Sequence, residues 1–284
     1  MVNRINAQIP KVVHYCWFGG NPLGEAERKC IDSWKRYLPG YEIVQWDEHN
    51  FDIQRCRYVA QAYEARKWAF VSDYARFSIL YEHGGLYFDT DVELIRSIDD
   101  IVAKGPFMGF ERDPAPGEKT MGPAVAPGLG LAANPGLGLA ANPGLGLYRL
   151  ILDSYEKSDF IKRDGSLDLT TVVSRTTEIL RQRGLTDIPG IQHVDGVDIY
   201  PKDYFNPKDY LTGKIEITDN TRSIHHFGMS WLSEGKQYTR KLTFRLVEAG
   251  FPSFAARLVA KVISTVRYGE YRELAKSISR HIKV

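Results

Sequence analysis

The chain has 284 residues, of which 43% are apolar and 25% are charged, so its composition excludes a disordered or collagen-like protein and allows a full hydrophobic core. The formal net charge is +2, but eleven Lys and Arg against three acids from Lys236 onward give that segment +8, leaving −6 for residues 1–235. We therefore divide the chain into a main domain, residues 1–235, and a basic helical tail, residues 236–284.

The cysteine pattern and the N-terminus bear on the compartment. The three cysteines are odd in number and form no CxxC pair, which argues against a disulfide framework and favours a reducing compartment. The first fifteen residues lack the apolar segment of a secretory signal. The uncharged run over 120–148 is too rich in Gly and Pro for a stable membrane-spanning helix. We expect a cytoplasmic protein.

The first half of the chain predicts an α/β fold. Residues 11–18 have the pattern of a buried strand, residues 41–46 have that of a second strand, and residues 25–38 between them have that of a helix. Strand, helix and strand in this order are typical of a parallel sheet covered by helices. Residues 68–83 predict an amphipathic helix that ends at a Gly pair, before a short strand at 86–88. A further strand is predicted over 106–110.

The second half contains a tandem repeat over 127–150, "PGLGLAAN PGLGLAAN PGLGLYRL". We interpret it either as a duplication that lengthened a loop or as a mobile lid with glycine hinges. Helices are predicted over 146–158 and 168–183.

The basic tail predicts an amphipathic helix whose apolar stripe consists of Phe251, Ala255, Leu258, Val262 and Val266. Arg257 and Lys261 lie elsewhere on the helical wheel. The stripe is either the packing face of an ordinary helix or, with the basic residues, a surface for anionic lipid headgroups. If the second holds, deleting residues 236–284 releases the protein from anionic liposomes.

Two aspartates follow the short strand in "GGLYFDTDVE", residues 84–93. In an extended strand Asp89 and Asp91 point to the same face, so they present oxygens to one point at the end of the strand. Carboxylates are the ligands that Mg²⁺ and Mn²⁺ prefer, together with substrate phosphate and water. Gly84 and Gly85 would allow a ligand to approach the backbone closely. A solvated surface turn is the alternative.

Other candidate site residues have equally plain structural explanations. Asp73 and Arg76, three apart on a helix, are either a surface ion pair or a clamp for ribose and phosphate. Trp17 at the end of the first strand either packs in the core or stacks on a base. His225 and His226 point opposite ways in a strand, so at most one can join a metal shell, where Mn²⁺ accepts nitrogen.

In combination these segments resemble the family 32 glycosyltransferases with a DXD sugar-binding region. The resemblance rests on "IPKVVHYCWFGG", "CIDSWKRYLPGYEIVQWDEHNFDI", "KWAFVSDYARFSILYEHGGLYFDTDVE" and "SIHHFGMSW", in that order. The family includes bacterial capsular and exopolysaccharide transferases and, more distantly, the catalytic domains of clostridial glucosylating toxins. The resemblance implies a GT-A type, Rossmann-like nucleotide-sugar-binding domain and retaining transfer from a UDP-sugar with Mn²⁺ or Mg²⁺.

The resemblance also implies residue roles. Trp17 would stack on the base, Asp73 and Arg76 would contact ribose and phosphates, and Asp89 would face the ribose or sugar. Asp91 would ligate the metal, with His225 or His226 completing its shell. Ser230 and Trp231 would close over the diphosphate. Asp89, Asp91 and Arg76 are the candidate catalytic residues.

We thus expect a hexosyltransferase that acts on a saccharide or lipid-linked acceptor, with no nucleic-acid partner and with the tail as a candidate attachment to the inner face of the membrane. A metal-dependent phosphohydrolase or nucleotidyltransferase that uses the same aspartates is the alternative enzyme. A non-catalytic membrane-binding module is a third interpretation.

Overall fold

The computed structural model describes residues 9–113, 132–134, 139–141, 144–209, 212–228 and 232–269. The chain forms two compact units. Unit 1 comprises Met1–Pro207 and Ile217–His226, and unit 2 comprises Lys208–Glu216 and Phe227–Val284. The second unit therefore begins nearer the N-terminus than residue 236, where the change in charge placed the domain boundary, and it includes a short earlier segment.

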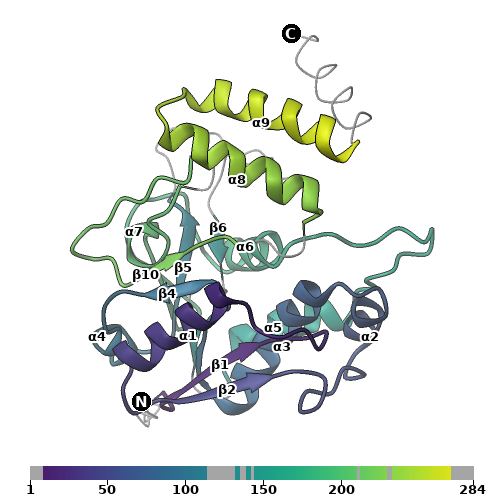
Figure 1. Cartoon of the computed structure of the whole chain (residues 1–284). Helices are drawn as coiled ribbons and strands as arrows, with labels where there is room; N and C mark the ends of the chain where they lie inside the picture. The colour runs from purple at the N-terminus through teal and green to yellow at the C-terminus, as the bar shows by residue number, and fades with distance from the viewer. Residues whose placement is uncertain are drawn as a thin grey trace. The chain divides into compact units, whose positions relative to one another are not determined.

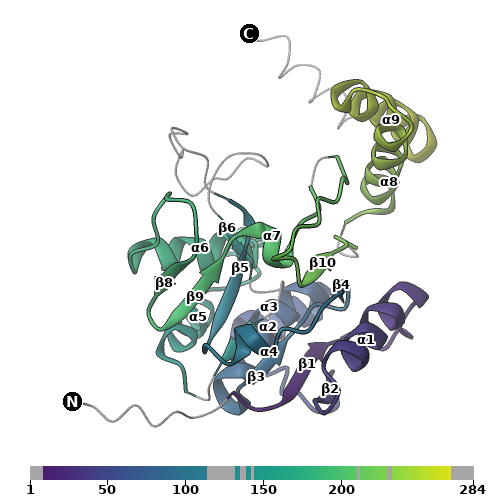
Figure 2. The same cartoon turned by 90° about the vertical axis from the view of Figure 1, so that its left-hand side faces the viewer.

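Unit 1 is built on a mixed sheet of 8 strands in the order β2-β1-β3-β7-β5-β9-β8, with β6 paired to β5 (Figure 1). The strands of this sheet are β1 (Val12–Cys16), β2 (Glu42–Trp46), β3 (Gly85–Tyr87), β5 (Phe107–Arg112), β6 (Ala132–Asn134), β7 (Leu139–Ala141), β8 (Gln192–Val194) and β9 (Val197–Tyr200). A separate two-stranded sheet pairs β4 (Val92–Leu94) with β10 (Ser223–His225). Strands β5, β9 and β8 lie side by side (Figure 2).

The described helices of unit 1 are α1 (Glu25–Tyr37), α2 (Arg57–Glu64), α3 (Trp68–His83), α4 (Asp99–Val102), α5 (Gly146–Glu156), α6 (Val172–Gln182) and α7 (Lys202–Phe205). The strand β1 pairs in parallel with both β2 and β3, and helices connect these strands. The predicted α/β class with a parallel sheet is thus confirmed. Helix α3 has the bounds that the sequence predicts.

Strand β1 shows how the sheet separates two apolar cores. Val13 and Tyr15 pack in one core with Trp34 of α1, whereas Cys16 packs in the other with Phe77 of α3. This is the two-residue alternation of a strand with both faces buried. The central strand is therefore fixed on both sides, which gives its carboxyl end a defined position.

The tandem repeat is not a simple loop. Two of its described pieces, β6 and β7, are strands, and β7 lies between β3 and β5 in the sheet. The loop prediction failed because Gly, Ala, Asn and Pro have low strand propensity, whereas backbone pairing with β3 and β5 decides the local structure. The rest of the segment 114–143 lies outside the described residues, so the lid interpretation stays a prediction.

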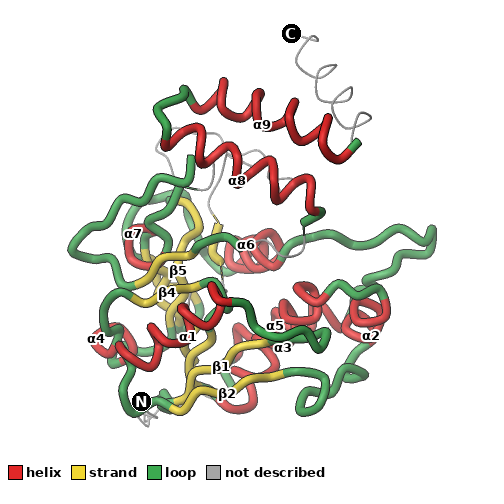
Figure 3. Tube along the Cα trace, in the orientation of Figure 1, coloured by secondary structure: helices red, strands yellow, loops and turns green. Residues whose placement is uncertain are grey.

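Unit 2 contains the helices α8 (Glu234–Glu248) and α9 (Ser253–Tyr268), which lie against each other (Figure 3). Helix α9 starts after Pro252 and ends at Gly269, whose φ of 69° is left-handed. On α9 the predicted stripe residues Leu258, Val262 and Val266 are exposed and Ala255 is half-buried, while Phe251 precedes the helix. Ala256, Ala260 and Ser264 are buried. Among the residues that the structure describes, we find no helix with the length and apolar character needed to cross a bilayer.

Candidate functional site

The glycine pair before the aspartates has a backbone role. Helix α3 ends at Gly84, with φ of 64°, and Gly85 follows with φ of 92°, both in the region that favours glycine. A Cβ on Gly85 would lie 2.7 Å from the carbonyl oxygen of Val12. The pair therefore allows the chain to leave α3 and to place β3 against β1.

The two aspartates lie in a turn and not in an extended strand. The Val92 amide donates to the Asp89 carbonyl over 3.0 Å, which closes the turn between β3 and β4. The expected strand alternation is thus wrong at this point. The two side chains nevertheless converge, because ligand atoms of Asp89, Asp91 and His225 all lie within 4.8 Å of one another.

Strand pairing brings His225 to the aspartates from 134 residues further along the chain. Strands β4 and β10 are antiparallel, with His225 opposite Val92, and His225 Nε2 lies 3.2 Å from Asp91 Oδ1. Burial lowers the pKa of His225, but the acidic groups around it, Asp91 first and then Asp89 and Glu111, together leave that pKa raised. In the absence of another cation, these acids therefore favour the imidazolium form of His225.

His226 faces another partner. Its Nε2 lies 2.7 Å from Glu93 Oε2, and its backbone amide donates to the Asp91 carbonyl over 2.9 Å. Adjacent residues in a strand point to opposite faces. Of the two candidate histidines, between which the sequence left the choice open, the structure places His225 in the cluster with the aspartates.

A buried arginine, Arg76, forms an ion pair with Asp89. Arg76 is only 4% exposed; its Nη2 lies 3.0 Å from Asp73 Oδ1 and 3.2 Å from Asp89 Oδ1. Its Nη1 also contacts Asp89, and its Nε donates to the Ser72 carbonyl. The predicted surface ion pair is thus a buried network that joins α3 to the turn. This geometry makes Arg76 a positioning residue for Asp89.

Electrostatics in this network reflect its burial. Burial raises the pKa of Asp73 to about 7, although the Arg76 guanidinium lowers it. Burial likewise raises the pKa of Asp89, with Arg76 again opposing it. The Arg76 guanidinium therefore opposes the effect of burial at both carboxyl groups, although the pKa of each stays raised.

Tyr87 is a site residue that the sequence interpretation missed. Its hydroxyl donates to Asp89 Oδ1 over 3.1 Å, and its ring lies 4.9 Å from the Arg76 guanidinium carbon. The signal was present in the sequence, since Tyr87 lies two residues before Asp89. Asp89 is thus held by one guanidinium and one phenol, while 27% of its side chain stays exposed.

Trp17 lies at the carboxyl end of β1, as the sequence predicts. Its side chain is half-buried, and its indole nitrogen donates to the Asn21 carbonyl. Beside it, Gly19 has φ of 94°, and a Cβ there would lie 2.6 Å from the Trp68 indole. The Gly19 amide also donates to the Glu48 carboxylate over 3.3 Å. The partly exposed Trp17 side chain therefore lies at the carboxyl end of β1, next to the Gly19 backbone that packs against Trp68.

Two predicted contacts stay untested. Ser230 and Trp231, expected over the diphosphate, lie outside the described residues.

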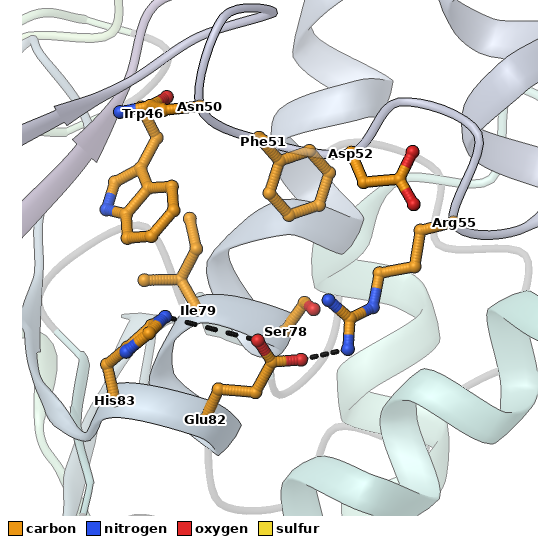
Figure 4. Close-up of a pocket in the computed structure, with 9 residues that line it drawn as sticks. All are labelled: Trp46, Asn50, Phe51, Asp52, Arg55, Ser78, Ile79, Glu82 and His83. Carbon is orange, nitrogen blue, oxygen red and sulfur yellow. Dashed lines mark hydrogen bonds and ion pairs between the residues drawn. The ribbon is translucent and has the colours of Figure 1, made fainter.

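A cavity of about 340 Å³ in unit 1 is distinct from this cluster (Figure 4). Its lining residues are Trp46, Asn50, Phe51, Asp52, Arg55, Ser78, Ile79, Glu82 and His83. The charged residues along one side pair with each other, since Glu82 contacts both Arg55 and His83. Of the predicted site residues that the structure describes, none lines this cavity.

The cluster around the turn fits a divalent cation. Two carboxylates and one imidazole form a donor set made mainly of oxygen atoms. This set suits Mn²⁺, which accepts a nitrogen ligand, and its two carboxylates alone would also suit Mg²⁺. His225 is buried, and the side chains of Asp89 and Asp91 are 27% and 22% exposed. The donor set can thus face a substrate on its open side.

Comparison with known proteins identifies the segment that carries this turn. Residues 24–108 match the family described as "Glycosyltransferase sugar-binding region containing DXD motif". The curated relatives include inositol phosphoceramide mannosyltransferases 3 and 1 of Schizosaccharomyces pombe, which are 30% and 29% identical over 109 and 110 residues. These matches cover 34% and 36% of this chain but only 28% and 34% of the relatives. The resemblance to DXD glycosyltransferases is confirmed for this segment.

Solved glycosyltransferase structures are also similar. The PaToxG glycosyltransferase has a TM-score of 0.40 at 17% identity, covering 61% of this chain and 69% of that one. A glycosyltransferase involved in the glycosylation of the major capsid of PBCV-1 has a TM-score of 0.42 at 10% identity, covering 80% and 97%. The α/β assignment itself rests on the strands and helices described above.

Proposed function

Because residues 24–108 carry the sugar-binding region of DXD glycosyltransferases, we propose that the chain is a metal-dependent hexosyltransferase with a GT-A type domain. It would move a sugar from a nucleotide-sugar, in the first place a UDP-sugar, to a saccharide or lipid-linked acceptor. The observation that carries the proposal is the cluster of Asp89, Asp91 and His225, in which Asp89 is paired with the buried Arg76.

Asp91, Asp89 and His225 would hold the cation, Mn²⁺ or Mg²⁺. When bound, a divalent cation supplies positive charge that stabilises a departing diphosphate. Arg76 and Tyr87 keep the Asp89 carboxylate in one orientation, through contacts of 3.1 to 3.3 Å. Such preorganisation matters because a ligand carboxylate that has to be reoriented loses part of its binding energy.

The donor would occupy the carboxyl edge of the parallel strands, where ligands gather in open α/β sheets. Trp17 at the end of β1 would stack on the base, and Ser230 and Trp231 would close over the diphosphate. Asp73 is 7% exposed and paired with Arg76, so a contact between it and a ribose requires that the donor reach the buried end of the network.

We propose retention of configuration at the anomeric carbon. The bond from the anomeric carbon to the phosphate oxygen breaks, and the bond to the acceptor oxygen forms on the same face. The acceptor proton passes to the leaving phosphate oxygen, which balances the charge. Nuclear magnetic resonance of the product tests this step, because an inverted anomer or a covalent glycosyl-enzyme would exclude it.

The decisive experiment is a panel of UDP- and GDP-sugars, each with Mn²⁺, with Mg²⁺ and with a chelator. Mannosyl donors belong in the panel because the relatives are mannosyltransferases. We expect metal-dependent release of nucleoside diphosphate, lost in Asp91→Asn and retained in Glu25→Gln, which removes an exposed carboxylate of a surface ion pair. Release of inorganic phosphate, or pyrophosphate exchange with a nucleoside triphosphate, would instead indicate the phosphohydrolase or nucleotidyltransferase.

A further inference from the structure

Helix α9 exposes an unusually apolar face. Its exposed large apolar residues include Val266 at 66%, Leu258 at 51% and Val262 at 44%. The full set on this face is Phe254, Leu258, Val259, Val262, Ile263 and Val266. At the angular step of an α-helix these six positions cover about half of the circumference. Burying an apolar face against its own unit is the usual outcome for a helix, so this face requires another partner.

The opposite face of α9 already has its partner. Ala256, Ala260 and Ser264 are buried, and the Ser264 hydroxyl donates to the Gly235 carbonyl of α8 over 2.8 Å. Small residues let the two helices pack closely. The apolar face of α9 therefore does not form the interface between the two helices.

The charge around this face is positive. Helix α9 contains Arg257, Lys261 and Arg267 and no acidic residue. Arg257 is exposed and Lys261 half-buried, and both lie on the wheel beside the Phe254 edge of the apolar face. The complementary partner is therefore anionic where it meets the edge and apolar where it meets the face.

We propose that α9 docks its apolar face into the surface of an anionic lipid bilayer. The face carries aliphatic and aromatic side chains without a hydrogen-bonding group, as acyl chains require, whereas protein interfaces combine apolar anchors with hydrogen bonds. The basic residues at its edge lie where lipid phosphates are found. This surface is independent of the catalytic cluster, so it goes beyond the proposed transfer reaction.

The test is sedimentation of the full chain with vesicles of phosphatidylcholine, alone or equimolar with phosphatidylglycerol. The wild type is expected to bind the anionic vesicles at low salt. Leu258→Gln with Val262→Gln should reduce partitioning about tenfold or more, since two apolar side chains no longer enter the bilayer. Arg257→Gln with Lys261→Gln should also reduce it about tenfold and weaken its salt dependence.

The matched control is Leu169→Gln with Ile188→Gln, which makes the same kind of change at residues of unit 1 that are 60% and 64% exposed. It should bind vesicles as the wild type does. All variants alter surface positions, so equal melting temperatures identify those that are correctly folded. Loss of vesicle binding in a variant with an unchanged melting temperature supports the docking face.

Three results would overturn the proposal. If the variant with Leu258→Gln and Val262→Gln binds anionic vesicles as strongly as the wild type does, the chain adsorbs to them through charge alone. Equal binding to neutral and anionic vesicles would remove the role of the basic edge. A wild type that ignores both vesicle types, and forms dimers that the apolar variant abolishes, would assign the face to a second copy of the chain.

Discussion

Acidification is expected to destabilise unit 1 through a single buried residue of the central strand, His14. Its ring is 3% exposed and lies between β2 and the end of α3. The Trp46 indole donates to His14 Nδ1 over 3.0 Å, so this nitrogen must be an acceptor. His14 Nε2 then carries the proton and donates to the Gly84 carbonyl over 3.1 Å. The contact with Trp46 requires the neutral imidazole, because a protonated Nδ1 has no lone pair to accept the bond.

The size of the effect follows from the pKa. Burial lowers the pKa of His14 from 6.5 to about 4, and the hydrogen bond to Gly84 only partly opposes it. Between these values the unfolded chain binds more protons than the folded one, so the free energy of unfolding falls as the pH falls. A tenfold difference in proton affinity between the two states corresponds to about 1.4 kcal/mol, which gives a loss of about 3 kcal/mol across the window. The stability that His14 contributes is thus complete above pH 6.5 and gone below pH 4.

Urea unfolding at several pH values between 7 and 4 measures this loss. His14→Gln removes the titration, so its free energy of unfolding should fall about 3 kcal/mol less over this range than that of the wild type. His83→Gln is the matched comparison, because that exposed ring lies 6.3 Å from His14 and is the smallest of the three influences on its pKa, so the pH dependence should change much less than in His14→Gln. If the difference between wild type and His14→Gln does not change with pH, the assigned tautomer and the buried neutral state are both wrong.

Three further predictions concern the site. Asp91→Asn should lower the transfer rate by about two orders of magnitude or more with a small effect on melting temperature, measured by nucleoside diphosphate release; unchanged turnover would exclude Asp91 from the cluster's function. Arg76→Met should cost about 3 to 5 kcal/mol of unfolding free energy, because it leaves buried carboxylates unpaired, and Asp73→Asn should recover part of this in a double-mutant cycle; additive losses would refute the network. Gly19→Ala should weaken nucleotide binding in calorimetry through its clash with Trp68, and an unaltered affinity would contradict that packing.

Local patterns predicted the elements of unit 1 well where one signal dominates. Helix α3 has apolar residues at helical spacing and a glycine stop, so the sequence alone indicated the helix and defined its C-terminal end. The strand β1 was recognised by its nearly continuous apolar run, which is typical of a strand buried on both faces of a parallel sheet. The repeat was misjudged for the opposite reason, because β7 depends on neighbours that lie far from it in sequence.

Side-chain placement was less predictable than the elements. Spacing suggested a clamp or an exposed ion pair for Asp73 and Arg76, but only the fold shows that both are buried beneath Asp89. On α9 the periodicity identified the apolar stripe, yet it could not show which face meets α8. There the small residues Ala256 and Ala260 pack, and the larger apolar residues stay outside. Periodicity identifies a face, whereas packing distance selects the residues that fit.

The register between β4 and β10 explains why one histidine of the pair joins the aspartates. Pairing of Ser223 with Leu94 and of His225 with Val92 sets the His225 ring on the side of Asp91. A shift by one residue would exchange the two histidine faces, because side chains alternate along a strand. The imidazole that faces Glu93 would then face Asp91, and the buried ring would face outward. The acidic turn and its third donor are therefore joined by a three-residue strand pairing, which no local pattern around the aspartates contains.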